Sequence, residues 1–331
     1  MIDQYDRNIN YLRVSVTDRC NLRCTYCMPK EGIAWIGHEA ILSYEEIGRI
    51  IRIAADEGIT KVRITGGEPL VRKGVVEFIA SLQGIRSLND ISLTTNGILL
   101  ESCAERLYAA GIHRINISLD SLKADKYREI TRGGELESVL AGIRKAETTG
   151  FSPIKINIVA IKGINDDEIL DFARLSLAHP YQIRFIELMP LGKASSENDG
   201  RYLANSVVKE RIAALGALEP VDGRANNASD GPARIFRLSG GAGEIGFISP
   251  VSRHFCQSCN RLRLTADGHL RACLLSDEER DLKTPLRAGA SNEEIGAIIR
   301  ETIARKPKEH GVSCDESHIR KCVKEMQAIG G

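Results

Sequence analysis

Three cysteines at C-x3-C-x2-C spacing constrain this chain more than any other feature of its sequence. They are Cys20, Cys24 and Cys27. A closed zinc site requires a fourth protein ligand, and so does an ordinary four-cysteine iron–sulfur cluster. Three thiolates on a four-iron cluster would instead leave one iron open to a cofactor or a substrate. The competing interpretation is a loop with three cysteines that bind no metal.

A second cysteine group has the spacing C-x2-C-x13-C. It consists of Cys256, Cys259 and Cys273, with His254 and His269 close in sequence. Either histidine could complete a zinc ribbon, which would only stabilise the fold. The alternative is a second four-iron cluster with one open iron, which would bind substrate.

Composition and charge exclude several classes of protein. No apolar run approaches the ~18 residues that a membrane span requires, and the polar first residues lack the apolar core of a signal peptide. The 45 Lys and Arg residues nearly balance the 44 Asp and Glu residues. There is therefore no global basic field for nucleic acid or acidic membranes. We expect a cytoplasmic protein that binds neither.

The grouping of the cysteines also suits a reducing compartment. There, cysteines in tight groups indicate metal ligands rather than disulfides. The three scattered cysteines, Cys103, Cys314 and Cys322, are expected to be buried or inert thiols.

A strand-like run followed by a helical pattern repeats between residue 10 and about residue 190. Six strands alternating with helices predict a parallel sheet wrapped by helices, either a barrel or a doubly wound sheet. The strands are expected at Tyr11–Thr17, Lys61–Thr65, Ile91–Asn96, Arg114–Asp120, Ile154–Ile161 and Gln182–Leu188. The helices are expected at Tyr44–Glu57, Val75–Leu82, Ala104–Ala110, Glu137–Thr148 and Asp167–Leu177.

The side-chain pattern of these strands favours a barrel. Parallel strands buried on both faces normally read as unbroken apolar runs. Here one face of each of the first five strands is polar, as with Asn116, Ser118 and Asp120 in the fourth strand. A polar lumen with nothing polar inside would carry a free-energy penalty. We infer a chamber that holds a large, hydrogen-bonding, anionic ligand. The alternative is that these residues are wetted strand ends at the barrel mouth.

The pattern changes after residue 190. Polar, breaker-rich loops are expected at 192–200 and 222–232, a helix at Tyr202–Leu215, and short strands at Arg234–Leu238, Glu244–Ile248 and Arg261–Thr265. A last helix is expected at Asn292–Ala304, with Ser291 as N-cap and Glu294 three residues on. We therefore divide the chain into a partial barrel, residues 1–215, and a C-terminal domain, residues 216–331.

Basic side chains stand beside both cysteine groups. Arg261 and Arg263 alternate along a strand-like run, so they point the same way. Two guanidiniums beside a metal centre suit bidentate recognition of phosphate. Arg13, Arg63 and Lys155, on the inward strand faces, support the same interpretation from the barrel. A nucleoside triphosphate stretched between the two centres matches this strip. The competing interpretation for any one arginine is a surface ion pair.

A turn of sequence Thr65-Gly-Gly-Glu-Pro69 follows the second strand. Glycines let the backbone approach a ligand closely, and Glu68 can accept a hydrogen bond from an ammonium group. Together with Tyr26 before the third cysteine, the turn resembles the motifs of radical S-adenosylmethionine (SAM) enzymes. The resemblance implies a [4Fe-4S] cluster on the first cysteine group, with SAM on its open iron. It implies SAM contacts from Tyr26, Gly67, Ser118 and Met189, although Met189 suits a core position equally well.

Over nearly its whole length the chain resembles the GTP 3′,8-cyclases of molybdenum cofactor biosynthesis. The additional features are the second cysteine group, the Arg261-Leu-Arg263 run and the terminal Gly330-Gly331. The resemblance implies an incomplete, six-stranded triosephosphate-isomerase-type barrel whose mouth is closed by the smaller C-terminal domain. It implies a second [4Fe-4S] cluster that binds guanine, and a double-glycine tail that reaches the active site. The implied GTP contacts are Arg13, Arg63, Thr94, Lys155, Arg261 and Arg263.

The same resemblance implies the reaction and the partners. A SAM-derived radical removes hydrogen from C3′ of GTP, and C3′ then attacks C8; no side chain is required to start this lyase reaction. The implied partners are an electron donor of the flavodoxin or ferredoxin type, cyclic pyranopterin monophosphate synthase as the next enzyme, and a second copy in a homodimer. The alternatives are a radical SAM enzyme acting on a peptide, an electron-carrier protein and a zinc-stabilised nucleotide sensor.

Overall fold

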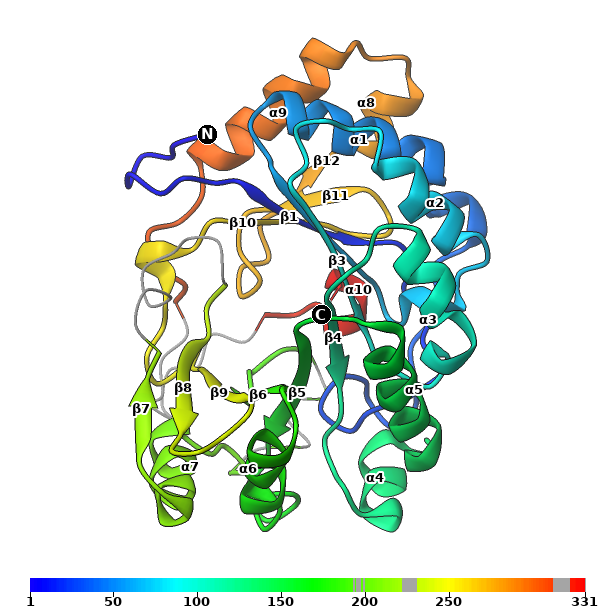
Figure 1. Ribbon diagram of the computed structural model, residues 1–331. Coiled ribbons are helices and arrows are strands. Elements are labelled where there is room, and N and C mark those ends of the chain that lie inside the picture. Colours follow the sequence, from blue (N-terminus) through cyan, green and yellow to red (C-terminus); the bar gives the residue numbers. More distant parts are fainter. Residues whose placement is uncertain (193, 195–197, 199, 222–230, 312–321, 331) are drawn as a thin grey trace.

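Six parallel strands form the centre of the molecule, and helices cover their outer face (Figure 1). The computed structural model describes residues 1–331 except 193, 195–197, 199, 222–230, 312–321 and 331. The central strands are β1 (Tyr11–Ser15), β2 (Lys61–Thr65), β3 (Asp90–Thr95), β4 (Ile115–Ser118), β5 (Ile154–Ala160) and β6 (Gln182–Glu187). They pair in sequence order from β1 to β6. The predicted incomplete (β/α)6 barrel is confirmed.

Helices follow the strands as the alternating pattern predicts. They are α1 (Tyr44–Asp56), α2 (Val75–Leu82), α3 (Leu100–Ala109), α4 (Ala124–Thr131), α5 (Leu136–Thr149), α6 (Ile169–Ala178) and α7 (Asn205–Ile212). The sequence analysis missed α4, a short helix with only a few buried apolar residues.

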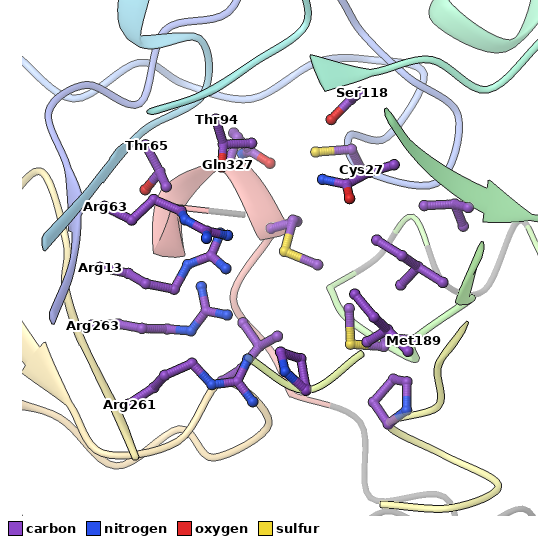
Figure 2. Close-up of a pocket in the computed structure, with 18 of the residues that line it drawn as sticks. Arg13, Cys27, Arg63, Thr65, Thr94, Ser118, Met189, Arg261, Arg263 and Gln327 are labelled. Atoms are coloured by element: carbon purple, nitrogen blue, oxygen red, sulfur yellow. The ribbon is translucent and has the colours of Figure 1, made fainter. Parts of the chain in front are cut away.

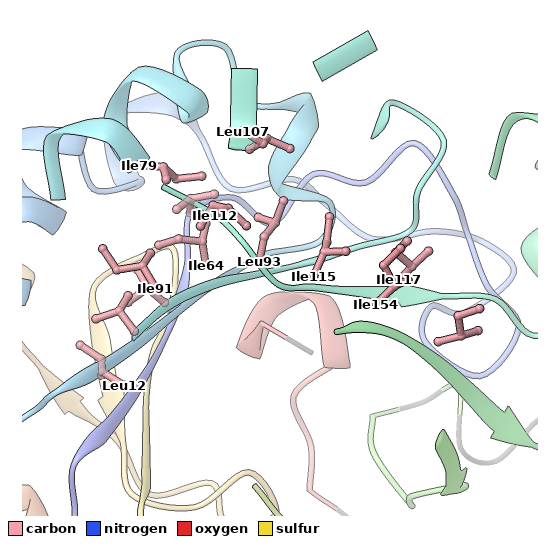
Figure 3. Close-up of a cluster of buried hydrophobic side chains, with 14 of the residues drawn as sticks. Leu12, Ile64, Ile79, Ile91, Leu93, Leu107, Ile112, Ile115, Ile117 and Ile154 are labelled. Carbon is pink, nitrogen blue, oxygen red and sulfur yellow. The ribbon is translucent and has the colours of Figure 1, made fainter. Parts of the chain in front are cut away.

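The outer faces of the strands form the main hydrophobic core. Ile64, Leu93 and Ile115 are fully buried there, beneath helical residues such as Leu107 of α3 (Figure 3). Because side chains alternate along a strand, this packing turns the polar residues between them into the barrel. The core thereby decides which residues face the chamber.

The C-terminal part of the chain extends the same sheet at both edges. Strand β10 (Arg261–Leu264) pairs in parallel with β1, and β9 (Glu244–Ile248) pairs in parallel with β6. The outer strands are β7 (Leu218–Pro220), β8 (Arg234–Leu238), β11 (His269–Arg271) and β12 (Arg280–Asp281). No break in the sheet marks the predicted boundary after residue 215 in the part that is described, and the division stays a prediction.

The remaining helices are α8 (Lys283–Arg287), α9 (Asn292–Ala304) and α10 (Met326–Ile329). Helix α9 packs against α1, whereas α10 returns to the interior of the barrel (Figure 1). In the ranges that the structure describes, no helix is long and apolar enough to cross a bilayer.

Candidate active site

Both cysteine groups line one cavity of about 300 Å³ inside the barrel. The cavity wall is formed by the polar faces of the strands, by the loops after them and by α10. Of the predicted SAM contacts, Tyr26, Gly67, Glu68, Ser118 and Met189 all line it, and so do Arg13, Arg63, Thr94, Arg261 and Arg263. The predicted chamber is therefore present, and these predicted residues lie in its wall.

The first cysteine group lies in a loop held by α4. The backbone N–H of Cys27 donates to Cys24 O at 2.9 Å, which closes a tight turn. The N–H of Thr25 donates to Ile130 O at the end of α4, and Arg132 Nη1 donates to Met28 O at 2.7 Å. Burial raises the pKa of Cys20 to about 11 and that of Cys27 to about 12. Both thiols therefore favour the protonated form, and a bound metal would stabilise the thiolates instead.

The Gly66-Gly67 turn packs against the chain entering that loop. A Cβ on Gly67 would lie 2.5 Å from Arg19 O, and the N–H of Gly67 donates to Thr17 O at 2.7 Å. The close neighbour of this glycine is thus the protein backbone itself. The two backbone segments can approach this closely only because Gly67 has no side chain.

Glu68 is held by hydrogen bonds from within the protein. Its carboxylate accepts from Leu70 N at 3.0 Å, from Thr95 Oγ1 at 2.8 Å and from Asn96 N at 2.6 Å. Burial raises its pKa to about 7. These hydrogen bonds tie the turn after β2 to the end of β3. The contact of Glu68 with an ammonium group stays a prediction.

Tyr26 is coupled to the end of β4. Its hydroxyl donates to Asp120 Oδ2 at 2.6 Å, and Asp120 Oδ1 accepts from Val159 N at 2.9 Å. Burial raises the pKa of Asp120 to about 6. Sequence periodicity placed Asp120 on the inward face but assigned it no function.

The second cysteine group has a more cationic environment. Burial acts to raise the pKa of Cys259, but the charges of Arg261 and Lys306 outweigh it and lower this pKa to about 6. Lys306 is 2% exposed, and its ammonium donates to Arg261 O at 2.8 Å and also to Ala272 O. Two of the three thiols, Cys259 and Cys273, lie near this buried cation.

Neither histidine considered for a zinc ribbon lines the cavity. His269 is paired with Asp267, with Nδ1 3.2 Å from a carboxylate oxygen, and His254 stacks edge-on with His310. Within the described ranges, no three His, Cys, Asp or Glu side chains converge as a single metal ion requires. A four-iron cluster needs no such convergence, because each cysteine binds a different iron.

Four arginines form one wall of the cavity. Arg13 lies between Arg63 and Arg263, directly opposite each in the register of β2, β1 and β10 (Figure 2). Like charges directly opposite each other on adjacent strands repel. Burial and the neighbouring guanidiniums lower the pKa of Arg13, and burial with Arg261 lowers that of Arg263 to about 9. We call Arg13, Arg63, Arg261 and Arg263 the arginine ladder, which a polyanion would stabilise.

Lys155 is the one predicted substrate contact among the described residues that does not line the cavity. It is buried on β5, opposite Gln182. Sequence analysis also missed residues that do line it, namely Arg184, His310 and Gln327. Arg184 follows from the same alternation that turns Asn157 of β5 into the cavity, whereas His310 and Gln327 belong to no motif.

Two of the scattered thiols, Cys103 and Cys322, lie outside the cavity wall. Cys103 is half-buried and donates to Leu99 O at 2.8 Å, as a helical residue without a special role would. Cys322 is buried and donates to Asp277 Oδ1 at 3.0 Å. Cys314 and Gly331 lie outside the described residues.

Comparisons with known proteins agree with this geometry. Residues 14–176 match the radical SAM superfamily, and residues 181–312 match the family described as Molybdenum Cofactor Synthesis C. A GTP 3′,8-cyclase of Moorella thermoacetica is 54% identical over 94% of this chain and 95% of its own length. This chain belongs to the GTP 3′,8-cyclase family. A second family member, from Thermodesulfovibrio yellowstonii, is 51% identical over the full length of both chains.

Solved structures share the fold. SuiB of Streptococcus suis, bound to its precursor peptide SuiA, has a TM-score of 0.62 at 13% identity, over 92% of this chain and 72% of SuiB. SuiB bound to SAM has a TM-score of 0.60 at 14% identity, over 88% and 68% of the two chains. This similarity shows that the chain shares the fold of SuiB.

Membership of the radical SAM superfamily implies SAM and a [4Fe-4S] cluster, and the site fits both. The three cysteines of the first group line the cavity together. Within the described part of the chain, Thr94 Oγ1 and Asn157 Oδ1 are buried in its wall without a hydrogen-bond partner. Buried polar atoms normally have partners, so such atoms indicate a polar ligand.

Proposed function

We propose that this protein is a lyase that cyclises GTP to 3′,8-cyclo-7,8-dihydroguanosine 5′-triphosphate, the first step of molybdenum cofactor biosynthesis. The observation that carries the proposal is one chamber lined by two incomplete cysteine groups and by the arginine ladder. A family whose members are named for this reaction supports it.

The first cysteine group would hold the [4Fe-4S] cluster, and Tyr26, Gly67, Glu68, Ser118 and Met189 would surround SAM. When bound there, the cluster and SAM would supply a 5′-deoxyadenosyl radical through one-electron reductive cleavage of SAM. The chain itself binds and orients GTP and excludes water, so that C3′ lies near this radical source. Transfer of the C3′ hydrogen atom to this radical would give 5′-deoxyadenosine. Formation of the C3′–C8 bond, with uptake of one electron from the electron donor and of one proton, would then give a product isomeric with GTP.

The arginine ladder would hold the triphosphate, with Thr94 and Lys155 as further contacts. Bidentate guanidinium–phosphate hydrogen bonds offset the repulsion within the ladder, which supports an anionic substrate. Cys256, Cys259 and Cys273 would hold a second [4Fe-4S] cluster whose open iron binds the guanine. Both histidines lie away from the cavity that these three thiols line, which supports a cluster over zinc.

Several features of the cellular context belong to the same proposal. The electron donor is of the flavodoxin or ferredoxin type, since one-electron reduction is required. The product passes to cyclic pyranopterin monophosphate synthase. The protein works in the cytoplasm as a homodimer.

The test combines metal analysis with product analysis. Anaerobically reconstituted protein should contain about eight irons and no zinc, because each cysteine group would hold four. With SAM, GTP and reductant it should form 5′-deoxyadenosine and a compound with the mass of GTP. Four irons with one zinc would disprove the second cluster, and 5′-deoxyadenosine without the isomer would disprove the substrate.

Replacing Arg263 by Ala should abolish cyclisation while SAM cleavage persists. The reason is that the ladder would bind substrate but would not be required to hold the first cluster. The iron content should equal that of the unaltered protein, and iron loss would contradict the substrate-binding role. Arg144→Ala, on the exposed face of α5, serves as the matched control.

A further inference from the structure

The side chain of Gln327 is buried without an internal hydrogen-bond partner. It is 2% exposed, and neither Oε1 nor Nε2 has a partner among the residues that the structure describes. A buried carboxamide in this state carries a free-energy penalty. Because Gln327 lines the cavity, its missing partners are to be found in a ligand of that cavity.

The backbone around Gln327 is held at both ends of α10. The N–H of Gln327 donates to the sulfur of Cys27 in the first cysteine group. Arg263 Nη1 of the ladder donates to Gly330 O at 2.6 Å. Helix α10 therefore spans the distance from the first cysteine group to the ladder, and Figure 2 draws Gln327 at the same end of the pocket as Thr94 and Cys27.

The chemistry of the carboxamide narrows the class of ligand. Oε1 is an acceptor and Nε2 is a donor. A bare phosphate could accept from Nε2 but could not satisfy Oε1. Sugar hydroxyls both donate and accept, and the hydroxyl of Thr94, on the same wall, also lacks a partner among the described residues.

We propose that Gln327 binds the ribose hydroxyls of a nucleoside held between the first cysteine group and the arginine ladder. The inference rests on the proposed function, in which two ribonucleosides, SAM and GTP, meet at this place. It assigns a ligand contact to the helix that precedes the terminal glycines.

The test compares Gln327→Met with the unaltered protein, both reconstituted anaerobically. Methionine keeps the length and apolar body of the side chain but removes both polar atoms. Equilibrium binding of SAM and of GTP is measured separately, together with iron content. One affinity should fall about 5- to 30-fold, as expected for the loss of one or two hydrogen bonds. The affected nucleoside identifies the ligand. Gln4→Met, on the exposed N-terminal segment, should change neither affinity.

The outcomes separate this inference from the proposed function. If Gln327→Met binds both nucleosides within twofold of the unaltered protein, the inference is wrong and the proposed function stands. If Gln327→Met loses iron, the residue supports the first cysteine group and is not a nucleoside ligand. If the unaltered protein binds neither nucleoside, the proposed function itself fails.

Discussion

At the scale of single residues, the two cysteine groups differ in the charge that surrounds them. Burial dominates at Cys20 and Cys27, whose pKa values rise to about 11 and about 12. At Cys259 the cations Arg261 and Lys306 outweigh burial, and the pKa falls to about 6. A thiol ionises when the pH of the solution is above its pKa. The two cysteine groups should therefore differ in reactivity when the metal is absent.

Alkylation of iron-free protein at pH 7 should therefore modify Cys259 first. At this pH Cys259 is mostly thiolate, whereas Cys20 and Cys27 remain protonated. The rate at Cys259 should fall as the pH drops below about 6. Mass spectrometry after brief treatment with iodoacetamide measures the order. Arg261→Met should reduce the preference, and equal labelling of all three thiols would contradict it.

At the scale of elements, local hydrogen bonds decide where helices begin. Ser291 accepts from Glu294 N at 3.2 Å, and Glu294 Oε2 accepts from Ser291 N at 2.7 Å, so the predicted capping box of α9 is confirmed. Ser43 and Glu46 form the same arrangement at the start of α1. Both helices begin where a serine satisfies backbone donors that the helix cannot.

Replacing Ser291 by Ala should lower the free energy of unfolding by about 1 kcal/mol. The reason is that the N–H of Glu294 loses its acceptor. Urea unfolding followed by circular dichroism measures the change. Ser138→Ala, at a half-buried position inside α5, is the control and should leave stability unchanged or slightly higher, since alanine favours helix. Equal effects of the two changes would argue against the cap.

The glycine turn after β2 packs against the chain that enters the first cysteine group, because Gly67 has no side chain. Gly67→Ala would push a Cβ to 2.5 Å from Arg19 O, so the chain entering the first cysteine group must shift. Iron should fall from about eight to about four per chain, with the second group retained. Gly37→Ala, where a Cβ meets nothing within 4 Å, is the control for metal analysis. Full iron content in the Gly67 variant would show that the loop tolerates the shift.

At the scale of the whole molecule, the first residues of the chain brace the second cysteine group. Arg7 is 5% exposed and pairs with Asp3 at 2.6 Å. Its guanidinium also donates to Cys256 O at 3.0 Å and to Pro307 O at 2.9 Å. One buried side chain thus joins the N-terminus, the loop of the second group and the segment after α9.

Arg7→Met should destabilise the protein by about 3 kcal/mol, because it leaves a buried Asp3 carboxylate and several carbonyls unpaired. The second group should lose iron before the first. Urea unfolding and metal analysis test this, with Arg86→Met, at an exposed loop position, as control. A stable variant with full iron content would show that water or other groups replace the guanidinium.

Local patterns in the sequence determined much of this protein. The cysteine spacings, the alternation that turns Arg13, Arg63, Thr94 and Ser118 inward, and the strand and helix positions all depend on neighbours a few residues away. The spacing of residues within a single strand, helix or loop is enough to predict these features. The missed α4 is short and mostly polar, so it offered few apolar positions for periodicity to detect.

Only the tertiary structure decided which distant residues meet. The pairing of β10 with β1 sets Arg263 opposite Arg13, 250 positions away, and thereby completes the ladder. The same level of structure gives Glu68 three internal hydrogen bonds, leaves Lys155 out of the cavity wall and returns Gln327 to the chamber. Strand register and the path of the C-terminal segment depend on how all elements pack together, and no local pattern encodes that packing.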